Sequence, residues 1–305
     1  MITVLGILAS GAVASQQEYG GAAGAMFRFG YGSRAMGLGG AVVSIAQDLS
    51  SVLFNPAGAA RLGGGRAELG LTVLPLNRRL QFLGIGQRVD SRVGWTLTWL
   101  SAGVGDLRGY DGNGEPTGSL DFREQQFAFS FGYRTGSSMA LGVSGKHYRH
   151  RLADDSTYGW GIDIGVIAQP YPGLQIGFAA RDLGGEVIWE ETENDNRISV
   201  GDRYRTVYAM GASYRPLLVK VLFVVDVERV RHEGTYINAG VSYSPAAKVI
   251  LRAGVRRIPV GDGAVEPAPT AGITVRPKLG ARQVGIDYAV TTDTFGTVHT
   301  LGLVF

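Results

Sequence analysis

The sequence predicts an all-β protein, a transmembrane antiparallel β-barrel of about 14 strands. Three observations support this fold class. First, bulky apolar and small residues alternate with period two in about fourteen segments, most of them about 9–12 residues long, as a tilted membrane-crossing strand requires. Second, the 305-residue chain has 47 Gly, only 18% charged residues and a mean hydropathy of +0.08. Third, no apolar run of about 18 residues, the length of a membrane-spanning helix, follows residue 15.

The first 15 residues are apolar and end in small residues, with Ala12-Val13-Ala14 near the end. Such a run before a small-residue cleavage site is typical of a secretory signal peptide. We therefore assign residues 1–14 to a signal peptide that is removed, although the run lacks the usual Lys or Arg before its apolar core. The alternative is a buried strand that belongs to the fold.

Residues 15–65 are rich in Gly and Ala and do not alternate. Gly37, Gly39 and Gly40 suit tight turns and close backbone approach. Asn55-Pro56 predicts the start of a helix, with Asn as the N-cap and Pro at the first helical position. Gly58 limits that helix to one or two turns. A segment with so many small residues fits a confined space such as the lumen of a barrel.

Two motifs of this segment resemble a known family. The run Gly-Ser-Arg-Ala-Met-Gly-x-Gly-Gly-Ala at 32–41 is followed by an Asp and then by Asn-Pro-Ala-Gly at 55–58. This order resembles the N-terminal region of the FadL-like outer-membrane family, most closely its PorV/PorQ-type branch. The resemblance implies that residues 15–65 form a hatch inside the barrel, and an ordinary N-capped turn outside any barrel is the alternative. The implied hatch residues are Arg34, Gly37, Gly39, Gly40, Asp48, Asn55, Pro56, Ala57 and Gly58.

Residues 66–305 supply the predicted barrel. In one segment Trp95, Leu97 and Trp99 share a face that is opposed by Thr96 and Thr98. One face of such strands is bulky and apolar with aromatic residues near the ends, and the other is small with scattered charges, as the outside and inside of a filled barrel require. The predicted strands span residues 66–74, 80–88, 92–101, 122–134, 138–149, 158–169, 173–182, 203–215, 217–229, 235–244, 247–258, 269–277, 280–291 and 295–305.

The connections between these segments alternate in length. Those after every even-numbered strand up to the twelfth are tight, whereas those after strands three, five, seven and eleven span about residues 102–121, 150–157, 183–202 and 259–268. Outer-membrane barrels have short periplasmic turns and longer outer loops. The parity therefore predicts an even number of strands with both termini on the periplasmic side. Fourteen is also the number that the FadL-like resemblance implies.

The last segment, residues 295–305, is an alternating strand that ends on an aromatic residue. In a barrel this strand would pair with the first strand, and the sheet would have no exposed edge. A terminal Phe on such a strand resembles the sorting signal of bacterial outer-membrane barrels, which implies recognition by the barrel-assembly machinery. A C-terminal strand of a soluble sandwich is the alternative. The residues on the signal face are His299, Leu301, Leu303 and Phe305.

We predict no enzyme activity, no metal site and no cofactor. The chain has no Cys, which excludes thiol catalysis and Cys-based zinc sites. His147 and His150 are the closest pair of His residues but face opposite sides of a strand, as do Ser144 and His147. Residues 111–115 resemble part of a calcium loop but lack its closing Glu, so a plain turn is the alternative. The net charge of +3 is too small to indicate nucleic acid as a partner.

Several charged residues fall on the small-residue face of the predicted strands. Charges inside a barrel must be paired or hydrated. One interpretation is a gating or substrate-path network with hatch residues such as Arg34 and Asp48. The other is structural pairing that holds the hatch in place. The candidates for the lumen are Asp163, Arg181, Arg205, Asp226, Glu228, Arg252 and Asp287.

Two functions from different classes remain. The main hypothesis follows the PorV/PorQ resemblance: an outer-membrane barrel that binds cargo or partner proteins in protein secretion or surface attachment. The alternative is FadL-like passive transport of hydrophobic small molecules such as long-chain fatty acids. Short outer loops favour the first, whereas apolar residues in those loops, such as Tyr110 and Trp189, favour the second. A structural barrel without an open path is a third possibility. All three place the protein among the lipids of the outer membrane of a Gram-negative-type bacterium.

Overall fold

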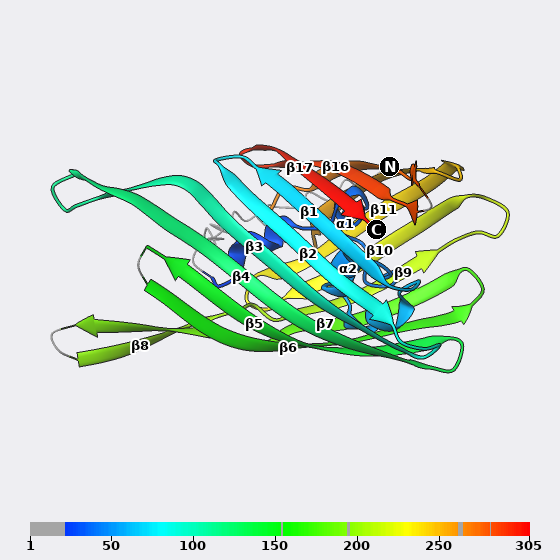
Figure 1. Cartoon of the computed structure of the whole chain (residues 1–305), viewed down its shortest axis with the longest axis horizontal. Helices are drawn as coiled ribbons and strands as arrows, with labels where there is room; N and C mark the ends of the chain where they lie inside the picture. The colour runs from blue at the N-terminus through cyan, green and yellow to red at the C-terminus, as the bar shows by residue number, and fades with distance from the viewer. Residues whose placement is uncertain (1–21, 154, 194–195, 262–264, 281) are drawn as a thin grey trace, which may run out of the picture.

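The computed structural model describes residues 22–153, 155–193, 196–261, 265–280 and 282–305. Their strands form one closed antiparallel barrel whose strands are strongly tilted (Figure 1). Fourteen strands make the ring, so the predicted all-β barrel and its strand number are confirmed. The predicted signal peptide and the first residues of the predicted hatch, 15–21, lie outside the described residues.

The ring strands follow one another in chain order with antiparallel neighbours. They are β1 (Arg66–Leu74), β2 (Arg78–Arg88), β3 (Val93–Tyr110), β4 (Pro116–Thr135), β5 (Met139–Leu152), β6 (Asp155–Tyr171), β7 (Leu174–Glu193), β9 (Val207–Tyr214), β10 (Val221–Val230), β11 (Gly234–Ala246), β12 (Val249–Pro259), β13 (Ala268–Val275), β16 (Gly285–Asp293) and β17 (Gly296–Val304). An extra strand, β8 (Asn196–Arg203), pairs with the far part of β7. Two short strands, β14 (Lys278–Leu279) and β15 (Arg282–Gln283), form a separate hairpin.

The first and last strands close the barrel. In the pairing of β1 with β17, Glu68 lies opposite Val304 and Val73 opposite His299. The start of β1 and the end of β17 therefore lie at the same end of the barrel, together with the connections that follow β2, β4 and β6. We call this the turn end, on the right in Figure 1. The long β3–β4 and β7–β8 hairpins project at the other end, which we call the hairpin end (Figure 1).

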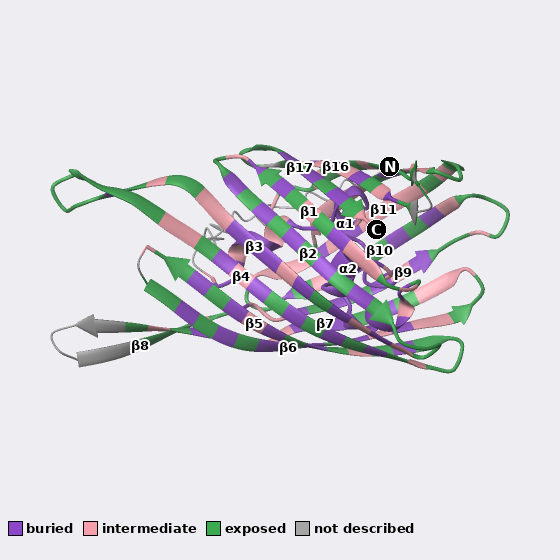
Figure 2. Ribbon diagram, in the orientation of Figure 1, coloured by how far each residue is buried: buried purple, intermediate pink, exposed green. Residues whose placement is uncertain are grey.

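Buried and exposed residues alternate along the strands (Figure 2). On β3, for example, Thr96 and Thr98 are buried whereas Leu97 is 47% exposed. The exposed outward residues are large and apolar on most strands. A continuous apolar outer surface of this kind is unfavourable in water and matches the hydrocarbon core of a bilayer. Outward residues of this class include Leu83, Ile85, Phe129, Phe131, Ile162 and Ile164.

Three of the predicted outer loops are largely strand, and one of them, residues 150–157, lies mostly in β5 and β6. Residues 102–121 extend β3 and β4, and residues 183–202 form most of the β7–β8 hairpin. Beyond the apolar zone the outward side chains no longer need to be apolar. The alternation that predicts strands therefore fades while the backbone hydrogen-bond ladder continues.

Some predicted strands also have different bounds, and two differ in kind. The strand predicted at 203–215 is interrupted, because β8 ends at Arg203 and β9 begins at Val207. Next to this break β7 contains two bulges, where Asp182 and Gly184 have positive φ. The strand predicted at 280–291 begins only at Gly285, because the β14–β15 hairpin occupies the residues before it.

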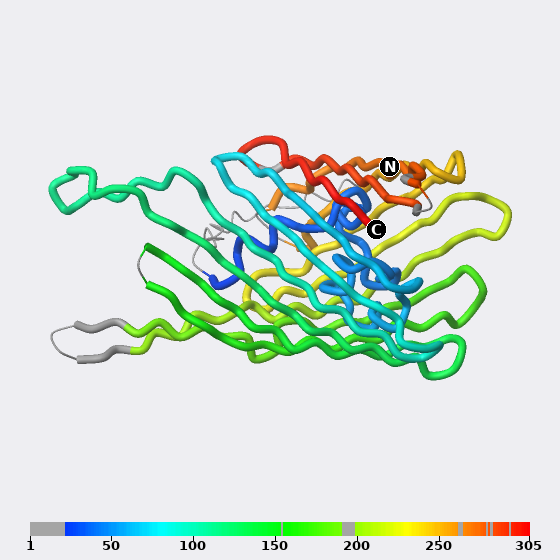
Figure 3. Tube along the Cα trace, viewed as in Figure 1, coloured from blue at the N-terminus to red at the C-terminus, as the bar shows by residue number. Residues whose placement is uncertain are grey.

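Residues 22–65 lie inside the barrel, where the blue part of the trace runs between the strands (Figures 1 and 3). We call them the luminal segment. It contains four short helices: η1 (Ala25–Phe29), α1 (Ser33–Gly37), α2 (Leu49–Val52) and η2 (Pro56–Arg61). Among the described residues, no helix has the length and apolar character needed to span a membrane.

Asn55 fixes the end of the luminal segment that the motif predicted to be a helix start. Its side-chain oxygen accepts a hydrogen bond from the backbone N–H of Ala57, 3.1 Å away, and Pro56 follows at the first helical position. Its amide group donates to the carbonyl oxygens of Val43 and Val166 at 2.8 and 3.1 Å. One side chain thus caps η2 and ties it to the luminal segment and to the barrel wall.

The small residues on the inner face have a packing role. A Cβ atom at Gly142 of β5 would overlap the backbone of Pro56 and Ala57, and one at Gly177 of β7 would overlap the backbone of Val43. The luminal segment therefore packs directly against the strand backbones, and larger inner residues would displace it.

Candidate functional site

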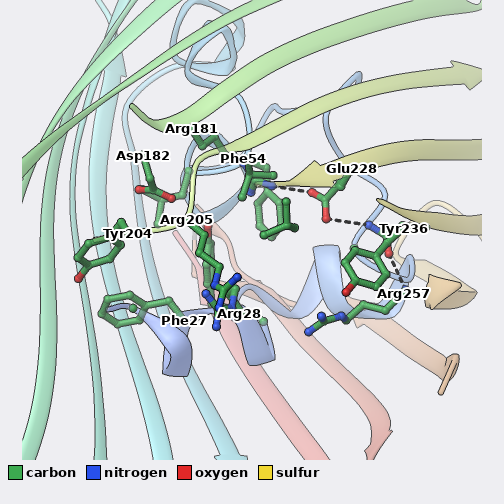
Figure 4. Close-up of a pocket in the computed structure, with 18 of the residues that line it drawn as sticks. Phe27, Arg28, Phe54, Arg181, Asp182, Tyr204, Arg205, Glu228, Tyr236 and Arg257 are labelled. Carbon is green, nitrogen blue, oxygen red and sulfur yellow. Dashed lines mark hydrogen bonds and ion pairs between the residues drawn. The ribbon is translucent and has the colours of Figure 1, made fainter. Parts of the chain in front are cut away.

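A cavity of about 110 Å³ lies in the lumen, between the luminal segment and strands β7 and β9 to β12. Figure 4 shows the side chains around it. Tyr31 and Phe54 contact each other, with ring centroids 4.9 Å apart. Burial raises the pKa of Tyr31 to about 12, so this hydroxyl stays neutral. The aromatic residues of the lining are Phe27, Tyr31, Phe54, Tyr204 and Tyr236.

Three guanidinium groups face one carboxylate at the wall of the cavity. Glu233, in the β10–β11 turn, has a carboxylate oxygen 2.6 Å from Arg257 Nη2, and the other oxygen lies 3.8 Å from the Nε atoms of Arg28 and Arg205. The Glu233 side chain is only 3% exposed. Figure 4 shows the Arg28 and Arg205 guanidinium groups side by side. These guanidinium groups are charged hydrogen-bond donors, which favour a polar or anionic group on a ligand.

A second ion pair lies at another wall of the cavity. Arg181 of β7 donates to Glu228 of β10 at 2.6 Å, and Asn238 donates to the other oxygen of Glu228 at 3.2 Å. The Arg181 guanidinium also lies 5.4 Å from the ring centroid of Phe54. The luminal segment and the wall therefore share one contact network at this point (Figure 4).

A buried polar network supports the bulged part of β7. Lys146 of β5 lies 2.8 Å from carboxylate oxygens of both Asp163 and Asp182. The hydroxyl of Tyr148 donates to Asp182 at 2.7 Å, and the backbone N–H of Asp182 donates to Asp163. Strands β5, β6 and β7 are thus held together where the regular ladder of β7 is interrupted.

Tyr204 lines the cavity on the side of the hairpin end. It lies in the break between β8 and β9, and its ring stacks on Tyr148 with centroids 3.8 Å apart. The Tyr204 hydroxyl lies 2.6 Å from Nε2 of His150. Gly24, at φ 71°, packs so closely on the ring that a Cβ atom would overlap it. Tyr204 and Arg205 also line a wider cavity of about 680 Å³ at the hairpin end.

A third cavity, of about 500 Å³, lies at the turn end and is lined by Arg34, Gln175 and Arg215, among others. Arg34 of α1 pairs with Asp48 at 2.6 Å, and Asp48 caps α2 by accepting from the backbone N–H of Ser51. Burial alone would raise the pKa of Asp48, but Arg34 and the Ser51 hydrogen bonds hold it below its ordinary value of 3.8. The luminal segment thus lies between the cavities of the two ends.

The predicted lumen residues fall into two groups. Arg181, Arg205 and Glu228 line the cavity of about 110 Å³, and Asp163 belongs to the network beside it. The other three lie elsewhere in the lumen. Of these, Asp226 accepts a hydrogen bond from the backbone N–H of Val43 at 2.9 Å.

The remaining two, Arg252 and Asp287, pair with each other at 3.4 Å. Arg252 lies against the backbone at Gly37 of α1. The predicted lumen residues thus comprise a group at the cavity and a group that contacts the luminal segment or lies beside it.

The predicted hatch residues all lie in the luminal segment. Gly39 and Gly40 have φ values of 69° and 83°, which L side chains rarely adopt, so the tight turns expected there are present. Gly37 instead is the last residue of α1. Asn55, Pro56, Ala57 and Gly58 form the capped start of η2.

Several residues of the site are not among the candidates that the sequence predicts. Lys146 and His150 face inward with Ser144 in the alternating pattern of β5. The period of the strand is therefore a sequence signal that places both side chains in the lumen. Glu124 accepts hydrogen bonds from the backbone N–H groups of Gly24 and Met26, a contact that no local pattern predicts. Glu233 lies in a turn and Tyr204 in a strand break, where no period applies.

Within the described part of the chain, no group of three or more His, Cys, Asp or Glu residues is arranged to hold a metal ion. The carboxylate of Asp111 accepts hydrogen bonds from the backbone N–H groups of Asn113 and Glu115, both at 2.9 Å. These contacts are those of a plain turn.

Solved structures with a similar fold include three outer-membrane transporters or their homologues. The toluene transporter TbuX of Ralstonia pickettii has a TM-score of 0.63 at 16% identity, over 90% of this chain and 97% of that chain. The toluene transporter TodX of P. putida has a TM-score of 0.63 at 13% identity, over 90% and 96%. A FadL homologue of Pseudomonas aeruginosa has a TM-score of 0.61 at 11% identity, over 90% and 96%. No family model and no curated protein matches the chain.

At these identities the likeness is one of fold. The chain has the fold of FadL-type outer-membrane transporters, which indirectly supports a location in the outer membrane. These structures support the FadL-like resemblance of the N-terminal motif but not its assignment to the PorV/PorQ branch.

Proposed function

We propose that the protein is a passive outer-membrane channel for small hydrophobic molecules. The observation that carries this proposal is the position of the aromatic cavity of about 110 Å³ between wider cavities of about 680 and 500 Å³ at the two ends of the lumen. A molecule that crosses the barrel would occupy them in turn. Tyr204 on one side and the α1–α2 region on the other would have to move aside. The predicted hatch role of the luminal segment is part of this proposal.

The size of the cavity favours a compact ligand. An apolar cavity of about 150 Å³ binds benzene, so about 110 Å³ suits a single ring or a short aliphatic stretch. TbuX and TodX, which have the same fold, are described as toluene transporters. A long-chain fatty acid would place only part of its chain here, and Arg28, Arg205 and Arg257 would supply the counter-charge for its carboxylate.

Binding of cargo or partner proteins in secretion or surface attachment is a second proposal. It rests on the N-terminal motif and on the β3–β4 and β7–β8 hairpins, which project well beyond the rest of the barrel (Figure 1). Such hairpins offer polar surface and strand edges to a partner. The similar structures favour transport, so we place this function second.

The test of transport is the uptake of radiolabelled toluene and oleate by cells that produce the protein in an outer membrane without related transporters. Val207 is buried and lines the cavity, so Val207→Trp would fill the cavity. The matched control is Met210→Trp, on the lipid-facing side of the same strand, where Met210 is 62% exposed. We expect uptake to fall to the background of cells without the protein in V207W and to stay unchanged in M210W. Equal uptake by V207W and the unchanged protein would contradict the proposed path.

Affinity purification from native outer membrane separates the two functions. Mass spectrometry of bound lipids and of co-purifying proteins is the readout. A bound hydrophobe without a stoichiometric protein partner supports transport. A stoichiometric secretion or cargo protein without an enriched hydrophobe supports the second proposal.

A further inference from the structure

The outward surface of β4 and β5 changes in ordered rows toward the hairpin end. The two strands pair directly, so each row contains one residue from each strand. Apolar and aromatic rows come first, followed by a mixed row and then by a row with two positive charges. In order toward the hairpin end the rows are Phe129–Gly145, Phe127–His147, Gln125–Arg149 and Arg123–Arg151.

Strand β6 continues these rows and marks the membrane interface. Trp160 lies opposite His147 and Tyr158 opposite Arg149. Trp160 is 70% exposed and Tyr158 52% exposed. Exposed Trp and Tyr on a barrel concentrate at the level of the lipid headgroups. The Arg149 guanidinium lies 5.7 Å from the Tyr158 ring, so the cations begin at this aromatic belt.

The three arginines point outward and are exposed. Glu124, next to Arg123 on β4, and His150, between Arg149 and Arg151 on β5, are buried in the lumen. Side chains alternate between the two faces along a strand. The outward side therefore carries Arg123, Arg149 and Arg151.

Their arrangement is electrostatically unfavourable without an anion. Arg123 lies directly opposite Arg151, and like charges in opposed positions destabilise a strand pair. Among the described residues, the ion pair of this cluster is that of Arg151 with Asp121, 3.8 Å apart. The Asp121 and Arg151 side chains are both about half exposed, so this pair is weak.

We propose that Arg123, Arg149 and Arg151 bind the phosphate groups of a phosphorylated lipid in the outer leaflet. Guanidinium groups match phosphate oxygens in bidentate geometry. The cluster begins at the aromatic belt, so a lipid whose phosphates meet the arginines can place its acyl chains on Phe127 and Trp160 below. Free phosphate has no part that contacts this apolar surface, so a lipid fits the whole surface better than free phosphate does. The surface is separate from the luminal cavity and does not depend on the proposed transport.

The test uses native mass spectrometry of the detergent-solubilised full chain with bisphosphorylated lipid A as the probe. The variant R123Q/R149Q/R151Q removes the cluster. The control R88Q/R92Q/R276Q removes the same charge from exposed positions at the turn end. Each basic side chain near an anionic lipid surface contributes roughly a fivefold factor in affinity. We therefore expect binding to weaken on the order of a hundredfold in the cluster variant and to change little in the control.

A comparison on the unchanged protein does not depend on how the variants fold. Lipid A from which both phosphates have been removed should bind on the order of a hundredfold more weakly than the bisphosphorylated form. Three results would overturn the proposal: equal binding of the two lipids, unchanged binding by the cluster variant, or an equal loss in the turn-end control. Heat-dependent migration in gels shows whether each variant is a folded barrel.

Discussion

Removal of the Tyr204 ring tests whether this side chain closes the luminal path. The ring is 7% exposed, stacks on Tyr148 and packs on Gly24 of the luminal segment. Truncation of a buried aromatic side chain to Ala costs about 3–5 kcal/mol. In Tyr204→Ala the closed arrangement loses that amount, and the cavities on the two sides of the ring become continuous.

The hydroxyl contributes much less than the ring. Tyr204→Phe keeps the stack and loses only the hydrogen bond to His150, which contributes about 1 kcal/mol. Since 1.4 kcal/mol is a factor of about ten in an equilibrium, we expect toluene uptake to rise at least about tenfold in Y204A and about fivefold or less in Y204F.

The assay is the initial rate of radiolabelled toluene uptake, normalised to the amount of folded protein in the outer membrane. Protection of the luminal segment from protease, measured in parallel, shows whether that segment stays docked. Uptake by Y204A no faster than that of the unchanged protein, with the segment docked, would refute a gate at Tyr204. Equal rates in Y204A and Y204F would assign the closure to the His150 hydrogen bond and not to the ring.

Three further predictions concern the luminal segment. An ideal Cβ at Gly302 lies 3.5 Å from the Cβ of Ser33, so S33C/G302C should form a disulfide. Oxidation of this variant should stop uptake and a reductant should restore it. Because the chain has no native Cys, the single-Cys variants should respond to neither treatment. Gly142→Val should undock the segment by about 3 kcal/mol or more, detected by protease sensitivity, whereas Gly145→Val, into open space on the same strand, should not. Because the folded pKa of Asp48 lies below 3.8, its stabilising contribution is present above that pH and is lost as the pH falls through the lowered value. Acid should therefore lower the hydrogen-exchange protection factors of α2, measured relative to the intrinsic rates at each pH, and Asp48→Asn should remove this dependence.

The strand count and the closure of the barrel could be predicted because a membrane imposes one period on every strand. The apolar outward face and the small inward face repeat from β1 to β17, and the register follows from that alternation. The same constraint disappears beyond the membrane. The β3–β4 and β7–β8 hairpins therefore looked like loops in the sequence, although their backbone pairing continues.

The candidate site could be predicted only in part, for a related reason. Arg181 and Glu228 were found because they interrupt a small-residue face. Tyr204 and Glu233 lie where the strand pattern stops, in a break and in a turn, and their importance depends on which distant residues meet there. Glu233 contacts arginines of the luminal segment, of the β8–β9 break and of β12. No spacing in the sequence relates the positions of these three arginines.

The packing of the luminal segment restricts how a path can open. Each fully buried large apolar side chain contributes about 1.5–3 kcal/mol, so the five fully buried Leu and Met side chains of this segment alone oppose its complete ejection by on the order of 10 kcal/mol. These side chains are Met36, Leu38, Leu49, Leu53 and Leu62. Ejection at that cost would occur too rarely to support transport, so passage requires local movements that leave most of these side chains in place. The Ser33–Gly302 lock fixes only α1, and loss of uptake on locking would therefore place the turn-end opening at this helix.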